Sequence, residues 1–166
     1  LHDIFTEEER YQMWHLFNIR RYLTYGPSAD YGDVRNQDAK ALLRDIVERA
    51  EDVISGKTAN EVATLRFGHD SAIIPLLAIL HAEGCDGRIS FAEIERLPEV
   101  WCDSRITCMS VNLQFIFYRN KQGDVLVRML HNERDLRLPV KSDNYPFYKW
   151  EDLRKYCLAQ SRPEAR

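Results

Sequence analysis

The sequence has few cysteines and no long hydrophobic run, and each shortage excludes a class of protein. Its four cysteines form no C-x-x-C pair, which argues against a zinc knuckle or a thiol redox motif. They allow one or two disulfides without requiring them. The longest apolar stretch, Ala72 to Leu80, is far below the roughly 20 residues that cross a bilayer, so no membrane span is expected. The four cysteines are Cys85, Cys102, Cys108 and Cys157.

An excess of positive charge is also missing. The 23 basic and 26 acidic residues give a formal net charge of -3. No global positive field therefore draws the chain to nucleic acid or to anionic lipid. What is present is the composition of a soluble globular protein, with 45% hydrophobic residues in a chain of 166. There is no internal repeat and no linker rich in glycine or serine, so one domain, or a piece of one, is expected.

Helix signals dominate the first half of the chain. A capping box at Thr6 begins a helix that ends near Tyr25, and apolar residues at helical spacing predict a second helix from about Asp38 to Ser55. Val62 to Phe67 is a short β-prone run, followed by an apolar helix over 71–81. A lone strand between two helices is unusual as a complete sheet, so its neighbours are expected to come from sequence outside this chain.

The second half predicts a β-hairpin. After a short helix that follows Ser90, two β-prone runs, 111–119 and 124–131, flank the turn residues Asn120 to Gly123. An aromatic loop and a last helix occupy 145–160. This order of elements indicates an α/β or an α+β fold.

His69 and Asp70 are the strongest candidate site residues, because they lie where the predicted strand ends and a helix begins. A helix N-terminus offers free N–H groups to an anion, Gly68 allows close backbone approach, and His69 can donate to a phosphate oxygen. Asp70 can protonate a leaving group if a neighbouring dianion raises its pKa. The structural alternative is that Asp70 or Ser71 merely caps the helix. Arg66 faces either this phosphate site or a sheet edge.

The segment Leu65-Arg-Phe-Gly-His-Asp-Ser-Ala-Ile-Ile-Pro-Leu-Leu-Ala-Ile-Leu80 resembles the C-terminal motif of the histidine acid phosphatases, in the branch of phytases and multiple inositol polyphosphate phosphatases. Tyr22-Leu-Thr-Tyr-Gly-Pro27 resembles the segment upstream of that motif. Three later segments resemble the family's C-terminal hairpin: Asn112 to Arg119, Val125 to Glu133 and Leu138-Pro139. The resemblance therefore runs, in order, over about residues 11–155.

The resemblance implies a three-layer α/β fold of the phosphoglycerate mutase type and phosphomonoester hydrolysis through a phosphohistidine. His69 would contact the phosphate and Asp70 would donate the proton, with Gly68, Ser71 and Arg66 beside the substrate. The family's nucleophilic histidine lies in an R-H-G-x-R-x-P motif, and no Arg-His-Gly triplet occurs here. Residues 1–166 are therefore expected to be the C-terminal portion of a single domain, inactive without its N-terminal part.

The resemblance also sets expectations about surroundings. It implies an inositol phosphate or another phosphomonoester as ligand, no metal or other cofactor, and a periplasmic or secreted location. A second hypothesis, from a different class, is a degenerate relative that binds a phosphate ester without hydrolysing it.

Two further motifs are interpreted as coincidences. His81-Ala82-Glu83 copies the His-Ala-Glu of inositol polyphosphate phosphatases, but it lies near 18 Å from His69 at about 1.5 Å per helical residue. Asp86 to Glu93 resembles the second half of an EF-hand loop, whose first half would place Ala82 and Gly84 where oxygen ligands are required. A capped short helix accounts for those residues.

Overall fold

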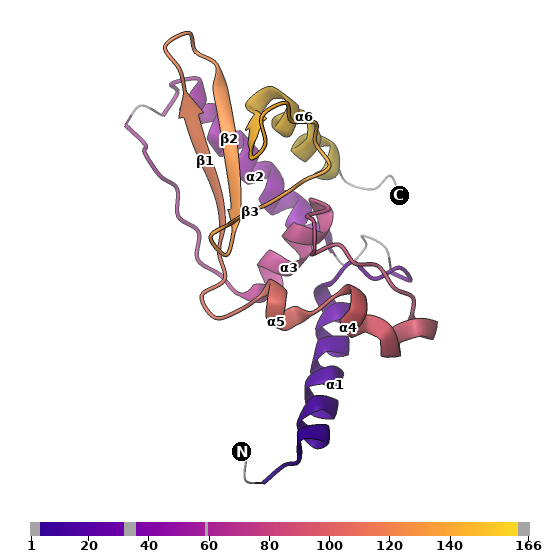
Figure 1. The fold of residues 1–166 in the computed structure, drawn as a ribbon. Helices are drawn as coiled ribbons and strands as arrows, with labels where there is room; N and C mark the ends of the chain where they lie inside the picture. The colour runs from indigo at the N-terminus through magenta and orange to yellow at the C-terminus, as the bar shows by residue number, and fades with distance from the viewer. Residues whose placement is uncertain (1–3, 32–35, 59, 163–166) are drawn as a thin grey trace.

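The computed structural model describes residues 4–31, 36–58 and 60–162 (Figure 1). The elements in chain order are α1 (Glu7–Tyr25), α2 (Gln37–Ile54), α3 (Asp70–Ile79), the 3-10 helix η2 (Phe91–Arg96), α4 (Leu97–Val100), α5 (Asp103–Ile106), β1 (Leu113–Arg119), β2 (Val125–His131), β3 (Arg134–Asp135), β4 (Phe147–Lys149) and α6 (Trp150–Gln160). This mixture of helices and sheet confirms the expected class, including the C-terminal hairpin.

Helix α1 begins where the capping box predicts. The Glu9 amide donates to the Thr6 hydroxyl at 3.2 Å, and the Glu9 carboxylate accepts from the Thr6 amide at 2.8 Å. The first turns of α1 extend away from the rest of the chain (Figure 1), and Leu16 and Phe17 are exposed on it. Farther along, Tyr22 is fully buried, and its hydroxyl bonds both the amide and the carbonyl of Ile89, at 2.7 and 3.1 Å.

Helix α3 lies at the centre of the core. All six of its residues from Ile74 to Ile79 are buried, and α2 packs against both α3 and α6. Burial on all sides explains why the sequence of α3 is apolar without an amphipathic pattern. The core fixes the direction of α3, and therefore the position of its first residues.

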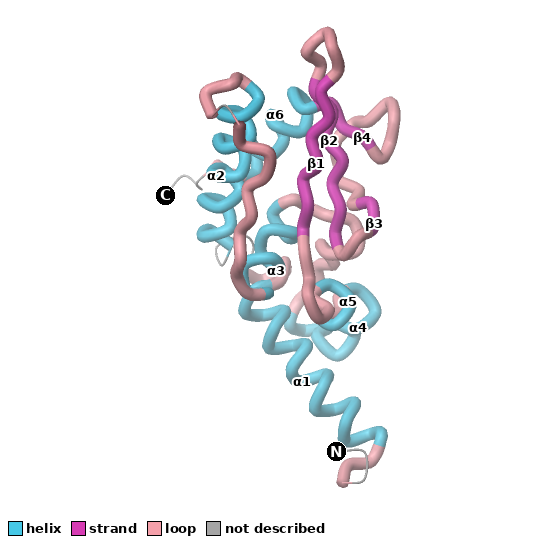
Figure 2. Tube along the Cα trace, turned by 90° about the vertical axis from the view of Figure 1, so that its left-hand side faces the viewer, coloured by secondary structure: helices cyan, strands magenta, loops and turns pink. Residues whose placement is uncertain are grey.

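The predicted hairpin forms an antiparallel pair from Leu113↔His131 to Arg119↔Val125. Asn120 shapes the turn by accepting from the Asp124 amide at 2.8 Å, and Gly123 has a φ of 95°, which favours glycine. Strand β3 pairs with the end of β2, and β4 pairs with its start. Val127 and Met129 of β2 are fully buried, and α2 and α6 lie to one side of the sheet (Figure 2).

The strand predicted over Val62 to Phe67 does not form. This segment is extended but has no β-partner among the described residues, and Val62, Leu65 and Phe67 are 100%, 76% and 93% exposed. It runs back along α2 (Figure 2), to which the Arg66–Asp45 ion pair ties it at 2.5 Å. The physical reason is that a strand needs a neighbour for its amides and carbonyls, and the described chain supplies none here.

The glycine at position 87, which takes part in the EF-hand resemblance, is explained by close packing of the backbone. A Cβ atom at this position would come within 2.1 Å of the Val100 carbonyl oxygen. Only glycine therefore allows the two backbones to approach this closely. The short helix η2 follows Ser90 as expected, but the Ser90 side chain forms no capping hydrogen bond, so the predicted cap is not made.

The cysteines form no disulfide among the described residues. All four cysteines are free thiols, with Cys85 and Cys157 buried and Cys108 exposed. Among the residues described, no helix has both the length and the apolar character needed to cross a membrane.

Candidate functional site

His69 and Asp70 lie at the junction that the sequence predicts. His69 is the residue before α3, with extended backbone angles of φ -113° and ψ 168°, and Asp70 is the first helical residue. His69 is exposed and Asp70 is half-buried. The buried helix behind them and the extended segment before them thus hold both side chains at an accessible helix N-terminus.

The first turn of α3 has part of its hydrogen bonding satisfied locally. The Ser71 amide donates to the Asp70 carboxylate at 2.7 Å, and the Ala72 amide donates to the His69 carbonyl at 2.9 Å. The His69 imidazole forms no hydrogen bond with any described residue, so it is available to a ligand. Together with the positive end of the helix dipole, this environment favours an anion.

Arg21 of α1 is a site residue that the sequence did not reveal. Its guanidinium forms ion pairs with Asp70 and, at 3.4 Å, with Asp103 of α5, and its side chain is only 12% exposed. The rings of Phe17 and Tyr25 lie 5.8 and 4.9 Å from the guanidinium carbon. No sequence signal could have identified it, because the contact joins residues 49 positions apart on two helices.

The contact with Arg21 sets the charge of Asp70. Its pKa is lowered from 3.8, chiefly by the hydrogen bond and charge of the Arg21 guanidinium, although burial opposes the shift. Asp70 is therefore a carboxylate at neutral pH. In this state it accepts hydrogen bonds, and it can donate a proton only after it has gained one.

Asp103 anchors the other side of this ion-pair cluster. Its carboxylate accepts from the Thr107 hydroxyl at 2.9 Å, and its amide donates to Asn18 at 2.8 Å. Because Asp103 is itself buried, its bonds fix Arg21 at the start of α3.

The other predicted site residues are close to His69 in sequence, but each has different contacts in the structure. Arg66 pairs with Asp45 of α2. Gly68 is exposed, and a Cβ atom added there would meet nothing within 4 Å. Ser71 is half-buried and uses its amide to bond Asp70. Contact between substrate and Arg66, Gly68 or Ser71 therefore stays a prediction.

Each other histidine in the described part of the chain has a partner away from His69. His15 contacts Glu95 at 3.3 Å, His81 contacts Asp86 at 2.7 Å, and His131 contacts the Ile106 carbonyl at 2.8 Å. His81 lies beyond the far end of α3, so the His-Ala-Glu copy does not share the site. None of these imidazoles is placed to act as a nucleophile beside His69.

Comparison with known proteins gives the fold its relatives. Neither a family model nor a curated protein matches the sequence. The apo form of a multiple inositol polyphosphate phosphatase from Bifidobacterium longum is similar in structure, with a TM-score of 0.74 and 24% identity, over 89% of this chain and 31% of that one. Its complex with inositol hexasulfate gives a TM-score of 0.70 at 24% identity, over 88% of this chain and 31% of that one.

This likeness establishes the class of fold. The chain has a mixed helix and sheet fold that matches part of the fold of this inositol polyphosphate phosphatase, and it spans less than a third of the solved relatives. The resemblance in sequence and the likeness in structure point to the same fold.

Proposed function

We propose that this chain is the C-terminal portion of a phosphatase that hydrolyses phosphomonoesters through a phosphohistidine. His69 binds the phosphate, and Asp70 donates the proton to the leaving group. The observation that carries this proposal is the pair itself: an unbonded imidazole and a carboxylate at an accessible helix N-terminus, within a fold similar to that of an inositol polyphosphate phosphatase. Gly68, Ser71 and Arg66 are proposed to line the substrate.

The exposed segment before His69 supports the idea of a larger domain. Leu65 and Phe67 are apolar and exposed on an extended backbone, which is how the inner strand of a sheet looks when its neighbours are absent. We propose that an N-terminal part containing Arg-His-Gly supplies those neighbours and the nucleophile. A phosphohistidine route needs a second imidazole in line with phosphorus.

Asp70 must change its protonation state during such a reaction. A bound phosphate dianion repels the carboxylate and raises its pKa, and it competes with Asp70 for the Arg21 guanidinium. Substrate binding would thus load the proton that Asp70 later gives to the leaving alkoxide. Charge on the transferring oxygens is carried by arginines and by the helix dipole, so the route needs no metal.

The proposed substrate is an inositol polyphosphate or another phosphomonoester. One of the similar structures is a complex with inositol hexasulfate, a polyanion with sulfates in place of phosphates. A periplasmic or secreted location is proposed from the family resemblance alone.

The test is phosphate release from inositol hexakisphosphate and from p-nitrophenyl phosphate by the protein expressed from its complete reading frame. His69→Ala is expected to lower kcat/KM by about 10²- to 10³-fold. Asp70→Asn is expected to lower kcat by about 10²- to 10⁴-fold. His81→Ala, in the His-Ala-Glu copy, is the matched control and should change neither kcat/KM nor kcat. The isolated 166-residue chain should release no phosphate. Unchanged turnover in His69→Ala would contradict the proposal.

A non-catalytic phosphate-ester-binding module is the second candidate, and one observation favours it. Arg21 holds Asp70 in the anionic form, and a carboxylate that carries no proton cannot act as the general acid. A complete protein that binds inositol hexasulfate through His69, yet hydrolyses neither ester, would select this candidate.

A further inference from the structure

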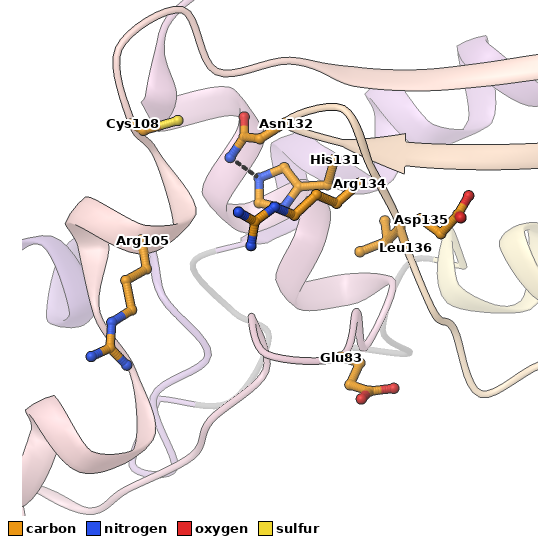
Figure 3. Close-up of a pocket in the computed structure, with 8 residues that line it drawn as sticks. All are labelled: Glu83, Arg105, Cys108, His131, Asn132, Arg134, Asp135 and Leu136. Carbon is orange, nitrogen blue, oxygen red and sulfur yellow. Dashed lines mark hydrogen bonds between the residues drawn. The ribbon is translucent and has the colours of Figure 1, made fainter.

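A surface hollow of about 590 Å³ lies away from the α3 N-terminus, between α5, the turn from β2 to β3 and the loop that follows α3 (Figure 3). Its volume is within the usual range for a small-molecule site. It shares no residue with the His69 site. It is lined by Glu83, Arg105, Cys108, His131, Asn132, Arg134, Asp135 and Leu136.

The two carboxylates of the hollow are paired with arginines outside it. Glu83 contacts Arg137 at 3.3 Å, and Asp135 contacts Arg128 at 2.6 Å. These pairs are largely neutral as units, so the acidic residues add little net negative charge to the hollow.

Its two arginines have no such partners. Neither Arg105 nor Arg134 forms a side-chain hydrogen bond or an ion pair with the described residues. Figure 3 shows the Arg134 guanidinium, from the start of β3, beside the His131 ring, and the Arg105 guanidinium, from α5, set apart from it. Two uncompensated positive charges therefore border one concave surface.

The remaining polar groups of the hollow are already engaged. His131 and Asn132 both contact the Ile106 carbonyl, at 2.8 and 3.2 Å. Burial lowers the pKa of His131, so this imidazole is neutral at neutral pH. The charge available to a ligand is therefore that of the two guanidinium groups, whose forked donors match oxyanions.

We infer that this hollow binds a tetrahedral oxyanion, the phosphate or sulfate group of a small molecule, through the guanidinium groups of Arg105 and Arg134. A planar guanidinium can bond two oxygens of such a group at once. The hollow is larger than one such ion, so the rest of an ester also has room beside the buried Leu136. The inference does not depend on the proposed function, because His69 and Asp70 take no part.

Titration calorimetry on the complete protein tests this site with inorganic phosphate and with inositol hexasulfate as probes. The measurements are made in a His69→Ala background, which weakens binding at the proposed site at α3. Arg105→Ala and Arg134→Ala are each expected to weaken binding at least about tenfold, as loss of a charge-assisted bond predicts. Lys121→Ala, in the hairpin turn, removes the same charge elsewhere and should change affinity less than about twofold. Tighter binding of inositol hexasulfate than of phosphate identifies an ester as the ligand.

Two results would overturn the inference: no binding of either probe at millimolar concentration in the His69→Ala protein, or equal losses in the arginine variants and in Lys121→Ala. Because both arginines are exposed and unpaired, the alanine variants should keep the wild-type melting temperature, which circular dichroism checks. Phosphate release by the wild-type protein is a separate measurement, so failure of the proposed phosphatase activity would not be confused with failure of this site.

Discussion

Arg21 sets the charge of Asp70, which belongs to the most informative motif of the sequence. The dipeptide His69-Asp70 is visible in the sequence, but the charge of its carboxylate depends on a guanidinium from another helix. Arg21 also forms an ion pair with the buried Asp103, so one side chain links three elements. A chemical role read from a motif is therefore conditional on a tertiary contact that no local pattern records.

The Arg21 contact predicts a pH-dependent contribution of Asp70 to stability. Its pKa is lower in the folded chain than its ordinary 3.8, so the stabilisation is present above that value and is lost as pH falls through the folded pKa. Asp70→Asn should lower the free energy of unfolding by about 1 kcal/mol at pH 7. This figure is modest because the carboxyl is partly exposed to solvent. The cost should shrink when urea unfolding is repeated near pH 3.

The control for this experiment is Asp152→Asn. Asp152 is exposed on α6 and has no ion pair in the part of the chain described, so its loss should change stability little at either pH. A cost for Asp70→Asn that stays constant between pH 7 and pH 3 would show that Arg21 does not stabilise the carboxylate.

The four thiols should differ sharply in reactivity. Burial raises the pKa of Cys85 to about 11 and that of Cys157 to about 12, and both side chains are inaccessible. Thiolate is the reactive form, so at pH 8 both should resist iodoacetamide until the protein unfolds. Exposed Cys108 should be alkylated first, as peptide mass spectrometry can show. Alkylation of Cys157 as fast as Cys108 in the native protein would contradict this burial.

At the scale of elements, those defined by local interactions were predicted correctly from the sequence, and the one that depends on distant residues was not. The capping box at Thr6 and the hairpin turn at Asn120 are local, and both elements formed where expected. The segment before His69 failed as a strand because pairing is not local: its composition favours a strand, yet no described partner is present. Its β-prone residues favour pairing with a strand, which the proposed N-terminal part would supply.

That segment gives a prediction for the complete protein. If an N-terminal part pairs with it, Leu65→Asp buries a charge there and should lower the free energy of unfolding by about 2–4 kcal/mol. Met109→Asp is the matched control, because Met109 is 95% exposed in a loop, and it should cost less than about 0.5 kcal/mol. Guanidinium unfolding of both variants measures the difference. Equal costs would argue against pairing of this segment.

For the whole molecule, the sequence predicted the position of His69 and Asp70 at a helix start better than it predicted their contacts. The positions of His69 and Asp70 follow from a turn between an extended run and an apolar helix, and this local arrangement was predictable. The ion pairs of Asp70 and Arg66 were not predictable, since they join α1 to α3 and α2 to the extended segment. The hollow beside Arg105 and Arg134 was equally invisible, because its residues come together only in the folded chain.

The burial of α3 has a consequence for ligand binding. A helix enclosed on all sides from Ile74 to Ile79 cannot shift without disturbing the core, so the N–H groups at its start are already oriented when an anion arrives. The entropy of ordering them is lost during folding and need not be lost again on binding. Affinity at this helix end should then depend mainly on desolvation and charge, with little contribution from backbone rearrangement.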